Sequence, residues 1–219
     1  MRYLFILILS FFSVNLFSQA FTKLSVKPGF SISNQKINSS VYKSGGNKLG
    51  LAFTVEPTIF TFGKNKQFDF NADLSFIQKG GIHSSAIYSY DQWGQLAGVG
   101  SESYRVTLNY FSIAPSFKVN LFKVLFAKVG PRIDVLSGFS SKAKFTPDTR
   151  AKNDFNNTTY GITYGAGISV GKNNVKFIAE FIGQNDFSYS YYKAMGNHHF
   201  TNHSYIVQAG VLIILKNKN

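Results

Sequence analysis

The chain has 219 residues, a formal net charge of +13 and no cysteine. Without cysteine it cannot be a disulfide-stapled scaffold, so packing and backbone hydrogen bonds must hold the fold. The basic residues are scattered and form no Lys/Arg block, which argues against a nucleic-acid partner. With 23 Phe, 12 Tyr and 19 Gly, the composition favours strands separated by turns.

The first residues have the pattern of a secretory signal peptide. Arg2 supplies a positive start, residues 3–12 form an apolar run, and Ser18-Gln19-Ala20 offers small residues for cleavage. An uncleaved membrane anchor is the rival interpretation, but a spanning helix needs about 20 apolar residues. We therefore expect residues 1–20 to be removed and residues 21–219 to form one domain.

Apolar and polar residues alternate with a period of two along nearly all of the remaining chain, which predicts strands and no helices. In one segment Phe111, Ile113 and Phe117 alternate with Ser112 and Lys118. Eight such segments are expected, at residues 22–34, 48–62, 66–80, 104–120, 122–139, 158–172, 174–187 and 203–216.

The connections between these segments alternate between short and long, as in outer-membrane β-barrels. The short ones lie at residues 63–66, 120–123 and 171–174, and carry Lys with Asn or Gly. The long ones lie at residues 35–47, 81–103, 140–157 and 188–202. The sequence therefore predicts an all-β fold, an eight-stranded antiparallel up-and-down transmembrane β-barrel in the outer membrane, with short turns in the periplasm and long loops outside.

Four prolines, Pro28, Pro57, Pro115 and Pro131, fall inside the expected strands, where each removes a ladder hydrogen bond. We expect bulges or strand ends at these positions. In the last segment, Gln208, Gly210, Ile213 and Leu215 have the spacing by which barrel-assembly machinery recognises its clients, which makes that machinery an expected partner.

Two stretches, Leu108 to Lys118 and Ala127 to Arg132, resemble the PorT-like, or porin-like, outer-membrane β-barrel family of the Bacteroidota. That family has one strand with the motif N-Y-x-x-I-P and a following strand with the motif G-P. It also has an acidic residue in a strand that ends in Q-K-G, which here is the segment from Asp73 to Gly80. This chain departs from the first motif, because Ala114 is inserted between the Ile and the Pro. The resemblance spans Lys23 to Leu215 and implies a barrel fold without a catalytic pattern; some relatives serve gliding or protease secretion.

The polar face of a membrane barrel points inward, so its charged residues must pair inside. An eight-stranded barrel is only wide enough for side chains to fill it, which favours an ion-paired interior over a narrow polar conduit. Small residues at alternate positions from Gly161 to Ser169 keep the conduit open as an alternative. The expected interior network consists of Lys27, Glu56, Asp69, Asp73, Lys79, Lys118, Lys128, Arg132, Asp134, Lys176 and Glu180.

The expected outer loops gather aromatic and histidine residues. Exposed aromatics suit a membrane-interface girdle or binding of a sugar or protein. All four histidines, His83, His198, His199 and His203, fall in these loops, but no cysteine or well-spaced carboxylate completes a metal site, so we expect no metal and no cofactor. The aromatic loop residues are Tyr88, Tyr90, Trp93, Tyr189, Tyr191 and Tyr192.

The favoured function is a surface-interaction or secretion-accessory scaffold with a charge-filled lumen. A narrow porin for small polar solutes and a soluble lipocalin-like binding protein are the alternatives. An enzyme is not expected, because Asp186, Ser188 and His198 lack a nucleophile motif around the serine. The expected partners are outer-membrane lipid and lipopolysaccharide, which the positive charge would attract, and an envelope or secretion protein.

Overall fold

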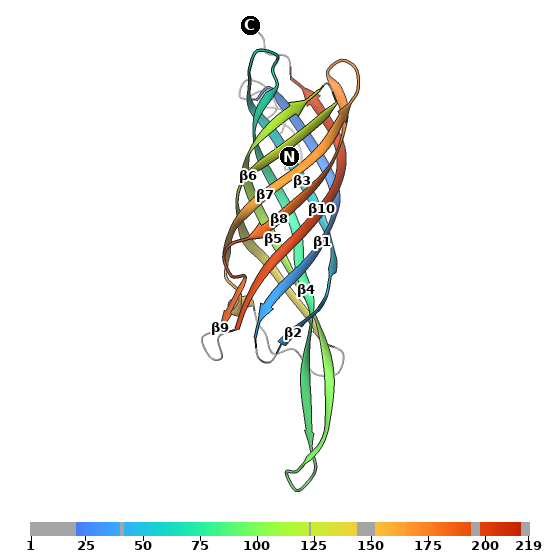
Figure 1. Ribbon diagram of the computed structural model, residues 1–219, viewed down its shortest axis with the longest axis vertical. Helices are drawn as coiled ribbons and strands as arrows, with labels where there is room; N and C mark the ends of the chain where they lie inside the picture. The colour runs from blue at the N-terminus through green and yellow to red at the C-terminus, as the bar shows by residue number, and fades with distance from the viewer. Residues whose placement is uncertain (1–20, 40–41, 123, 144–151, 194–197, 216–219) are drawn as a thin grey trace, which may run out of the picture.

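The computed structural model describes residues 21–39, 42–122, 124–143, 152–193 and 198–215, so the expected signal peptide lies outside the described residues. These residues form strands and one 3-10 helix, η1 (Lys152–Asp154) (Figure 1). The strands are β1 (Lys23–Asn38), β2 (Tyr42–Gly46), β3 (Lys48–Phe62), β4 (Phe68–Tyr90), β5 (Leu96–Leu121), β6 (Leu125–Ala143), β7 (Thr158–Val170), β8 (Val175–Asp186), β9 (Tyr191–Lys193) and β10 (His198–Ile214).

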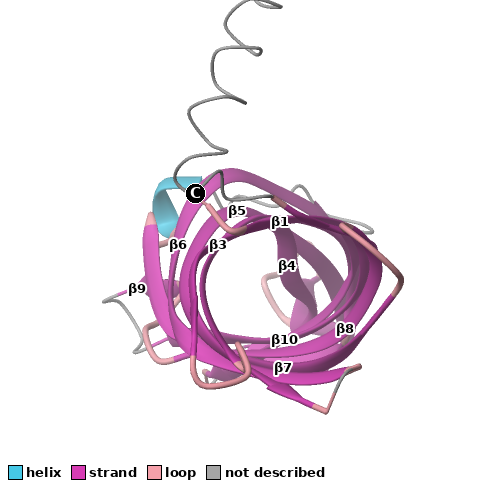
Figure 2. Cartoon of the chain, turned by 90° about the horizontal axis from the view of Figure 1, so that it is seen from above, coloured by secondary structure: helices cyan, strands magenta, loops and turns pink. Residues whose placement is uncertain are grey.

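Eight antiparallel strands close into a barrel, which Figure 2 shows along its axis. Their order is β1, β3, β4, β5, β6, β7, β8 and β10, and β10 pairs back to β1. The two short strands lie outside this ring order: β2 pairs with β4, and β9 pairs with β10. In the described part of the chain, no helix is long and apolar enough to cross a membrane. The predicted eight-stranded up-and-down barrel is confirmed.

The apolar face of each strand points outward. In β5, Phe111 and Ile113 are 59% and 55% exposed, whereas Ser112, which lies between them, and Lys118, farther along the strand, are buried. In β6, Ile133 faces outward and its neighbour Asp134 is fully buried. Hydrocarbon is the surrounding that suits such an outer wall. A soluble lipocalin-like barrel needs the opposite arrangement, so that alternative is wrong.

The short connections gather at one end of the barrel, which we call the turn end. Lys66 and Asn173 adopt left-handed backbone conformations there, with φ values of 53° and 61°. The Lys66 amide donates to the carbonyl oxygen of Gly63 over 3.0 Å, which closes the first turn. The short connections at residues 63–66 and 171–174 are where the sequence places them.

The opposite end, which we call the loop end, contains more strand than the sequence predicts. Residues 81–103 are not a loop: β4 and β5 pair without interruption from Phe68 with Val119 to Ser89 with Gly98. This hairpin projects well beyond the barrel (Figure 1). Because both faces of the projecting part meet solvent, its sequence carries no apolar alternation, and the pattern that reveals the other strands is missing. Parts of the other predicted loops are likewise strand, in β1, β2, β6, β9 and β10.

The strand prolines do not all cause bulges. Near Pro57 the pairing of β3 with β4 shifts register between Thr58 and Phe60, as expected. Pro115 and Pro131 produce no shift, because β5 and β6 keep one register from Ile113 with Ile133 to Phe117 with Val129. Proline removes only its own N–H from the ladder, so a strand can lose a rung without losing its register. The expectation of a bulge or a strand end is wrong for this pair.

Candidate functional site: the filled barrel interior

Three cations and three carboxylates meet near the middle of the barrel. We call Lys27, Glu56, Asp73, Lys118, Lys128 and Glu180 the central cluster. Lys128 Nζ lies 2.9 Å from Glu56 Oε2, 2.8 Å from Asp73 Oδ2 and 3.2 Å from Glu180 Oε2. Lys27 bridges Glu56 and Glu180, and Lys118 Nζ lies 2.9 Å from Glu56 Oε1. Charges taken out of water need such mutual compensation, so this cluster is a balanced, desolvated network.

A second network, the loop-end cluster, consists of Lys79, Arg132, Asp134 and Asp186. Lys79 Nζ lies 2.5 Å from Asp134 Oδ2 and 3.4 Å from Asp186 Oδ1. Arg132 pairs with both carboxylates, and all four side chains are fully buried. Asn202 Nδ2, on β10, donates a hydrogen bond to Asp186 Oδ2 over 2.9 Å, so a neutral wall residue also contacts the cluster. Two cations and two carboxylates again balance.

The turn end has a wide mouth. Lys23 donates to both oxygens of Asp69, over 2.7 and 2.8 Å, and this pair lies nearer the turn end than the central cluster. Thr61 and Asn120 donate to the same carboxylate. Around the pair is an open cavity of about 1230 Å³, which we call the turn-end cavity.

An apolar layer fills the barrel beyond the loop-end cluster. Phe200 is fully buried and stacks on Tyr191 with ring centroids 4.6 Å apart, and His83 packs edge-on against it. The sequence does not predict this layer, because Phe155, Tyr191 and Phe200 reach it from segments expected to be outer loops. We call it the apolar plug; its members are Val106, Leu108, Tyr110, Leu136, Phe155, Tyr191 and Phe200.

Glycines on β7 make room for long side chains on β6. Arg132 lies opposite Gly161 and Phe126 lies opposite Gly167 in the ladder. A Cβ atom at Gly161 would lie 2.7 Å from Arg132 Nη2, and one at Gly167 would lie 2.5 Å from Phe126 Cζ. Gly161 and Gly167, two of the small residues that kept a polar conduit open as an alternative, are therefore covered by these neighbours.

The residues that the sequence predicts for the interior network are all buried except Lys176. Each of the buried ones takes part in an ion pair. Lys176 is half-buried and lines the turn-end cavity. Sequence reasoning missed Lys23 and Asp186, although the same period-two pattern continues from Lys27 to Lys23 and from Glu180 to Asp186. It also missed that Phe126 and Ile178 point inward.

The predicted aromatic loop residues separate into two groups. Tyr88, Tyr90 and Trp93 are 57%, 64% and 77% exposed on the projecting hairpin. Tyr189 is exposed and stacks on His199. Tyr191 is buried in the apolar plug, so its expected place in an exposed loop is wrong, because β9 folds back onto β10. The Tyr192 side chain lies outside the described residues.

The histidines do not gather. His83 lies inside the barrel, not in a loop, with Nε2 2.7 Å from Gln35 Oε1. His203 lies in β10, with Nδ1 3.0 Å from Asn185 Oδ1. Within the described residues, no three His, Cys, Asp or Glu side chains are arranged to hold a metal ion. Asp186, a candidate for a catalytic triad, is bound to Arg132, and the His198 side chain lies outside the description.

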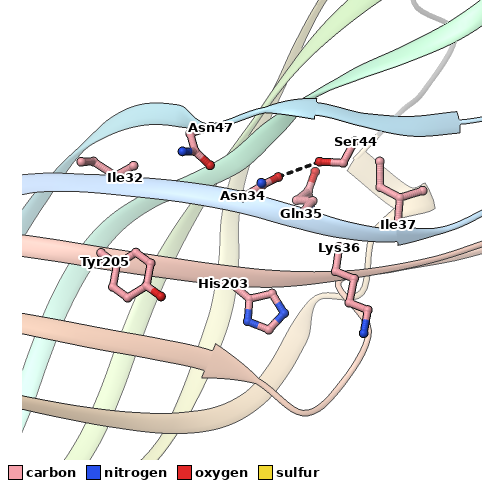
Figure 3. A pocket seen from close by; sticks show the side chains of 9 residues that line it. All are labelled: Ile32, Asn34, Gln35, Lys36, Ile37, Ser44, Asn47, His203 and Tyr205. Carbon is pink, nitrogen blue, oxygen red and sulfur yellow. Dashed lines mark hydrogen bonds between the residues drawn. The ribbon is translucent and has the colours of Figure 1, made fainter.

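A groove of about 500 Å³ lies on the wall near the loop end, between β1, β2 and β10 (Figure 3). It forms where β2 leaves its neighbour β1 and pairs with β4 instead. One hydrogen bond, from Ser44 Oγ to Asn34 Oδ1 over 2.9 Å, spans the gap. The lining mixes apolar Ile32 and Tyr205 with Lys36, so the groove is amphipathic.

A family model described as an outer membrane protein beta-barrel domain matches residues 17–211. The chain belongs to this family. This outer-membrane protein therefore resides in the cell outer membrane, which agrees with its apolar outer wall. The family match is coarser than the PorT-like resemblance and leaves the role of the protein open.

Solved structures similar to this outer-membrane protein share little sequence with it. The attachment invasion locus protein Ail of Yersinia pestis is 12% identical, with 87% of this chain and 98% of that one covered and a TM-score of 0.42. Neisserial surface protein A is 12% identical, with 87% of this chain and 96% of that one covered and a TM-score of 0.45. The Escherichia coli outer membrane protease OmpT is 9% identical, with 87% of this chain and 95% of that one covered and a TM-score of 0.42. No curated protein matches the sequence significantly.

Proposed function

We propose that this outer-membrane protein is a surface-interaction scaffold with a closed lumen, which presents the β4–β5 hairpin outside the cell. The observation that carries the proposal is the projection of this hairpin beyond the barrel (Figure 1). Past Ser85 and Ser103, its two strands pair only with each other in the described structure. Two open strand edges and a row of exposed aromatic side chains suit recognition of a protein partner.

The composition of the hairpin supports this role. Asp91 is the only charged residue between Ser84 and Ser101, and that stretch has no proline. Exposed edge strands are normally protected from pairing by Lys, Pro or a bulge. This hairpin has no Lys or Pro in that stretch, and the pairing of β4 with β5 shifts register only between Ser89 and Tyr90, beside the tip. Its long edges therefore favour pairing with a partner strand, whereas a passive loop would carry more charge.

A narrow porin for small polar solutes is disfavoured by the filled interior. The central cluster, the loop-end cluster and the apolar plug follow one another along the barrel axis, and a solute would have to break buried ion pairs to pass. Breaking one such pair costs about 3–5 kcal/mol. A secretion-accessory role within the PorT-like group is compatible with a closed scaffold and rests on the Gln78-Lys79-Gly80 and Gly130-Pro131 motifs. We propose no catalytic activity.

Lipid and assembly partners are also part of the proposal. Lys36 beside Ile32 in the wall groove suits a lipid or lipopolysaccharide headgroup whose chains lie against the wall. In the folded chain Gln208 is bonded to Glu180, and Gly210 approaches the backbone of Val26 closely, so the last-strand pattern also serves packing. Recognition by the barrel-assembly machinery would precede these contacts.

Site-specific labelling tests the orientation, because the chain has no native cysteine. We expect Gln92→Cys at the hairpin tip to react with a membrane-impermeant maleimide on intact cells. The matched Lys64→Cys at the turn end should react only after the envelope is broken. Labelling of Lys64→Cys on intact cells, or conductance steps from the purified protein in planar bilayers, would overturn the proposed function.

A further inference from the structure

The turn-end cavity is the mouth of the barrel itself. All eight strands of the ring contribute to its lining, so the strands wall it off from the surrounding membrane. Its inner end is closed by Lys118, whose Nζ is held by Glu56 of the central cluster. The cavity is therefore a blind recess that opens only beyond the turn end.

The lining of this recess is strongly positive. Lys23, Lys66, Lys118 and Lys176 line it, against a single carboxylate, Asp69. That carboxylate is saturated by Lys23, Thr61 and Asn120. Lys66 and Lys176 have no carboxylate partner among the described residues. The recess therefore carries uncompensated positive charge, in contrast to the balanced clusters deeper in the barrel.

The positive charge continues onto the rim. Lys64 and Lys172 are exposed on the two turns beside the mouth, and the described residues of the turns contain no acidic side chain. The cations are thus spread from the floor of the recess to its edge. Charges distributed in this way match an extended anion better than a compact one.

We propose that the turn-end cavity binds an acidic peptide segment, rich in Asp or Glu, that enters from beyond the turns. A volume of about 1230 Å³ accommodates several residues of an extended chain. Asn65, Asn120 and the unpartnered hydroxyl of Ser169 supply hydrogen bonds for its backbone. A membrane phospholipid is excluded as the occupant, because its chains would have to leave the bilayer to bring the headgroup to the barrel axis.

If the hairpin faces outside the cell, as the proposed function has it, the turn end faces the periplasm and this segment belongs to a periplasmic protein. Only this assignment rests on the proposed function. The site would tether the barrel to that protein without opening the lumen, since Lys118 and the central cluster stay in place. Binding to purified protein in nanodiscs exposes both ends, so it tests the site whichever way the protein faces in the cell.

The experiment measures the fluorescence anisotropy of a labelled ten-residue peptide of alternating Glu and Gly, titrated with the full-length protein in zwitterionic nanodiscs. We expect saturable binding that weakens with salt and is absent for the Gln–Gly peptide. The double variant Lys66→Gln with Lys176→Gln should bind about tenfold more weakly. The matched double variant Lys43→Gln with Lys142→Gln at the loop end, with the same charge change, should bind like the parent.

Several outcomes would overturn the proposal: no binding of the Glu peptide at low salt, equal binding of the Gln peptide, or equal losses in both double variants. Displacement by inorganic phosphate, at an ionic strength matched with chloride, would assign the recess to a small anion instead. Heat-dependent migration on gels verifies that each variant is folded before it is compared.

Discussion

The guanidinium of Arg132 occupies the space that Gly161, its partner across the β6–β7 ladder, leaves free. From there Arg132 reaches Asp186 and Asp134 and completes the loop-end cluster. A large charged side chain can lie against this wall only because the opposite residue has no side chain. The balance of the interior charges thus depends on residue size as well as on charge.

Replacing Gly161 by alanine should therefore destabilise the barrel by about 1–3 kcal/mol, the usual cost of overpacking. The new methyl group would lie 2.7 Å from Arg132 Nη2 and closer still to the backbone oxygen of Asn185, and that backbone cannot yield easily. Chemical denaturation followed by circular dichroism in detergent measures the effect. Gly100→Ala is the control, because a Cβ there meets no atom within 4 Å. Equal stability of the two variants would contradict the size argument.

Lys128→Met should destabilise the protein more strongly, by about 3–5 kcal/mol. Lys128 contacts three carboxylates, and its loss leaves Glu56, Asp73 and Glu180 with only Lys27 and Lys118 to compensate them. The same denaturation measurement applies, with Lys172→Met on an exposed turn as the control. A change below about 1 kcal/mol would mean that water already screens these carboxylates.

The alternation of residues was enough to predict that the polar face of the strands, with most of its charged side chains, points inward, because a wall between lipid and a polar interior imposes opposite chemistry on its two faces. It did not predict which charges meet. Lys128 and Asp73 are 55 residues apart in sequence and lie on strands separated by β5. Their contact depends on the register of two successive ladders, and no local pattern encodes that register.

The apolar plug and the projecting hairpin escaped prediction for a related reason. Leu108 and Tyr110 point inward at the loop end, where the interior turns from charged to apolar, so alternation there no longer separates the two faces. Tyr88 and Val99 pair on a ribbon whose two faces both meet solvent. In both places the two sides of the strand have similar surroundings, and the period-two signal disappears.

Phe200→Ala should weaken the loop end without opening the lumen. Phe200 is fully buried against Tyr191 and His83, and loss of a buried phenylalanine costs about 3–5 kcal/mol. Planar-bilayer recordings should nevertheless show no conductance steps, because the loop-end and central clusters still fill the barrel below. Phe187→Ala, at a residue 72% exposed, is the control for stability. Conductance steps in Phe200→Ala alone would show that the plug is the only barrier to passage.

Asp91→Ala should loosen the hairpin tip and leave the barrel unchanged. Asp91 Oδ1 accepts hydrogen bonds from the backbone amides of Trp93, over 2.9 Å, and Gln95, over 2.8 Å, and so fixes the turn between β4 and β5. Trp93 is the only tryptophan, so its fluorescence reports on the tip alone. We expect lower anisotropy of this emission and faster proteolysis at the tip, while the global free energy of unfolding changes by no more than about 0.5 kcal/mol. Gln92→Ala, which leaves the Asp91 carboxylate and its two hydrogen bonds in place, should change neither. A global loss above about 1 kcal/mol would show that the hairpin folds as part of the barrel and not as an independent projection.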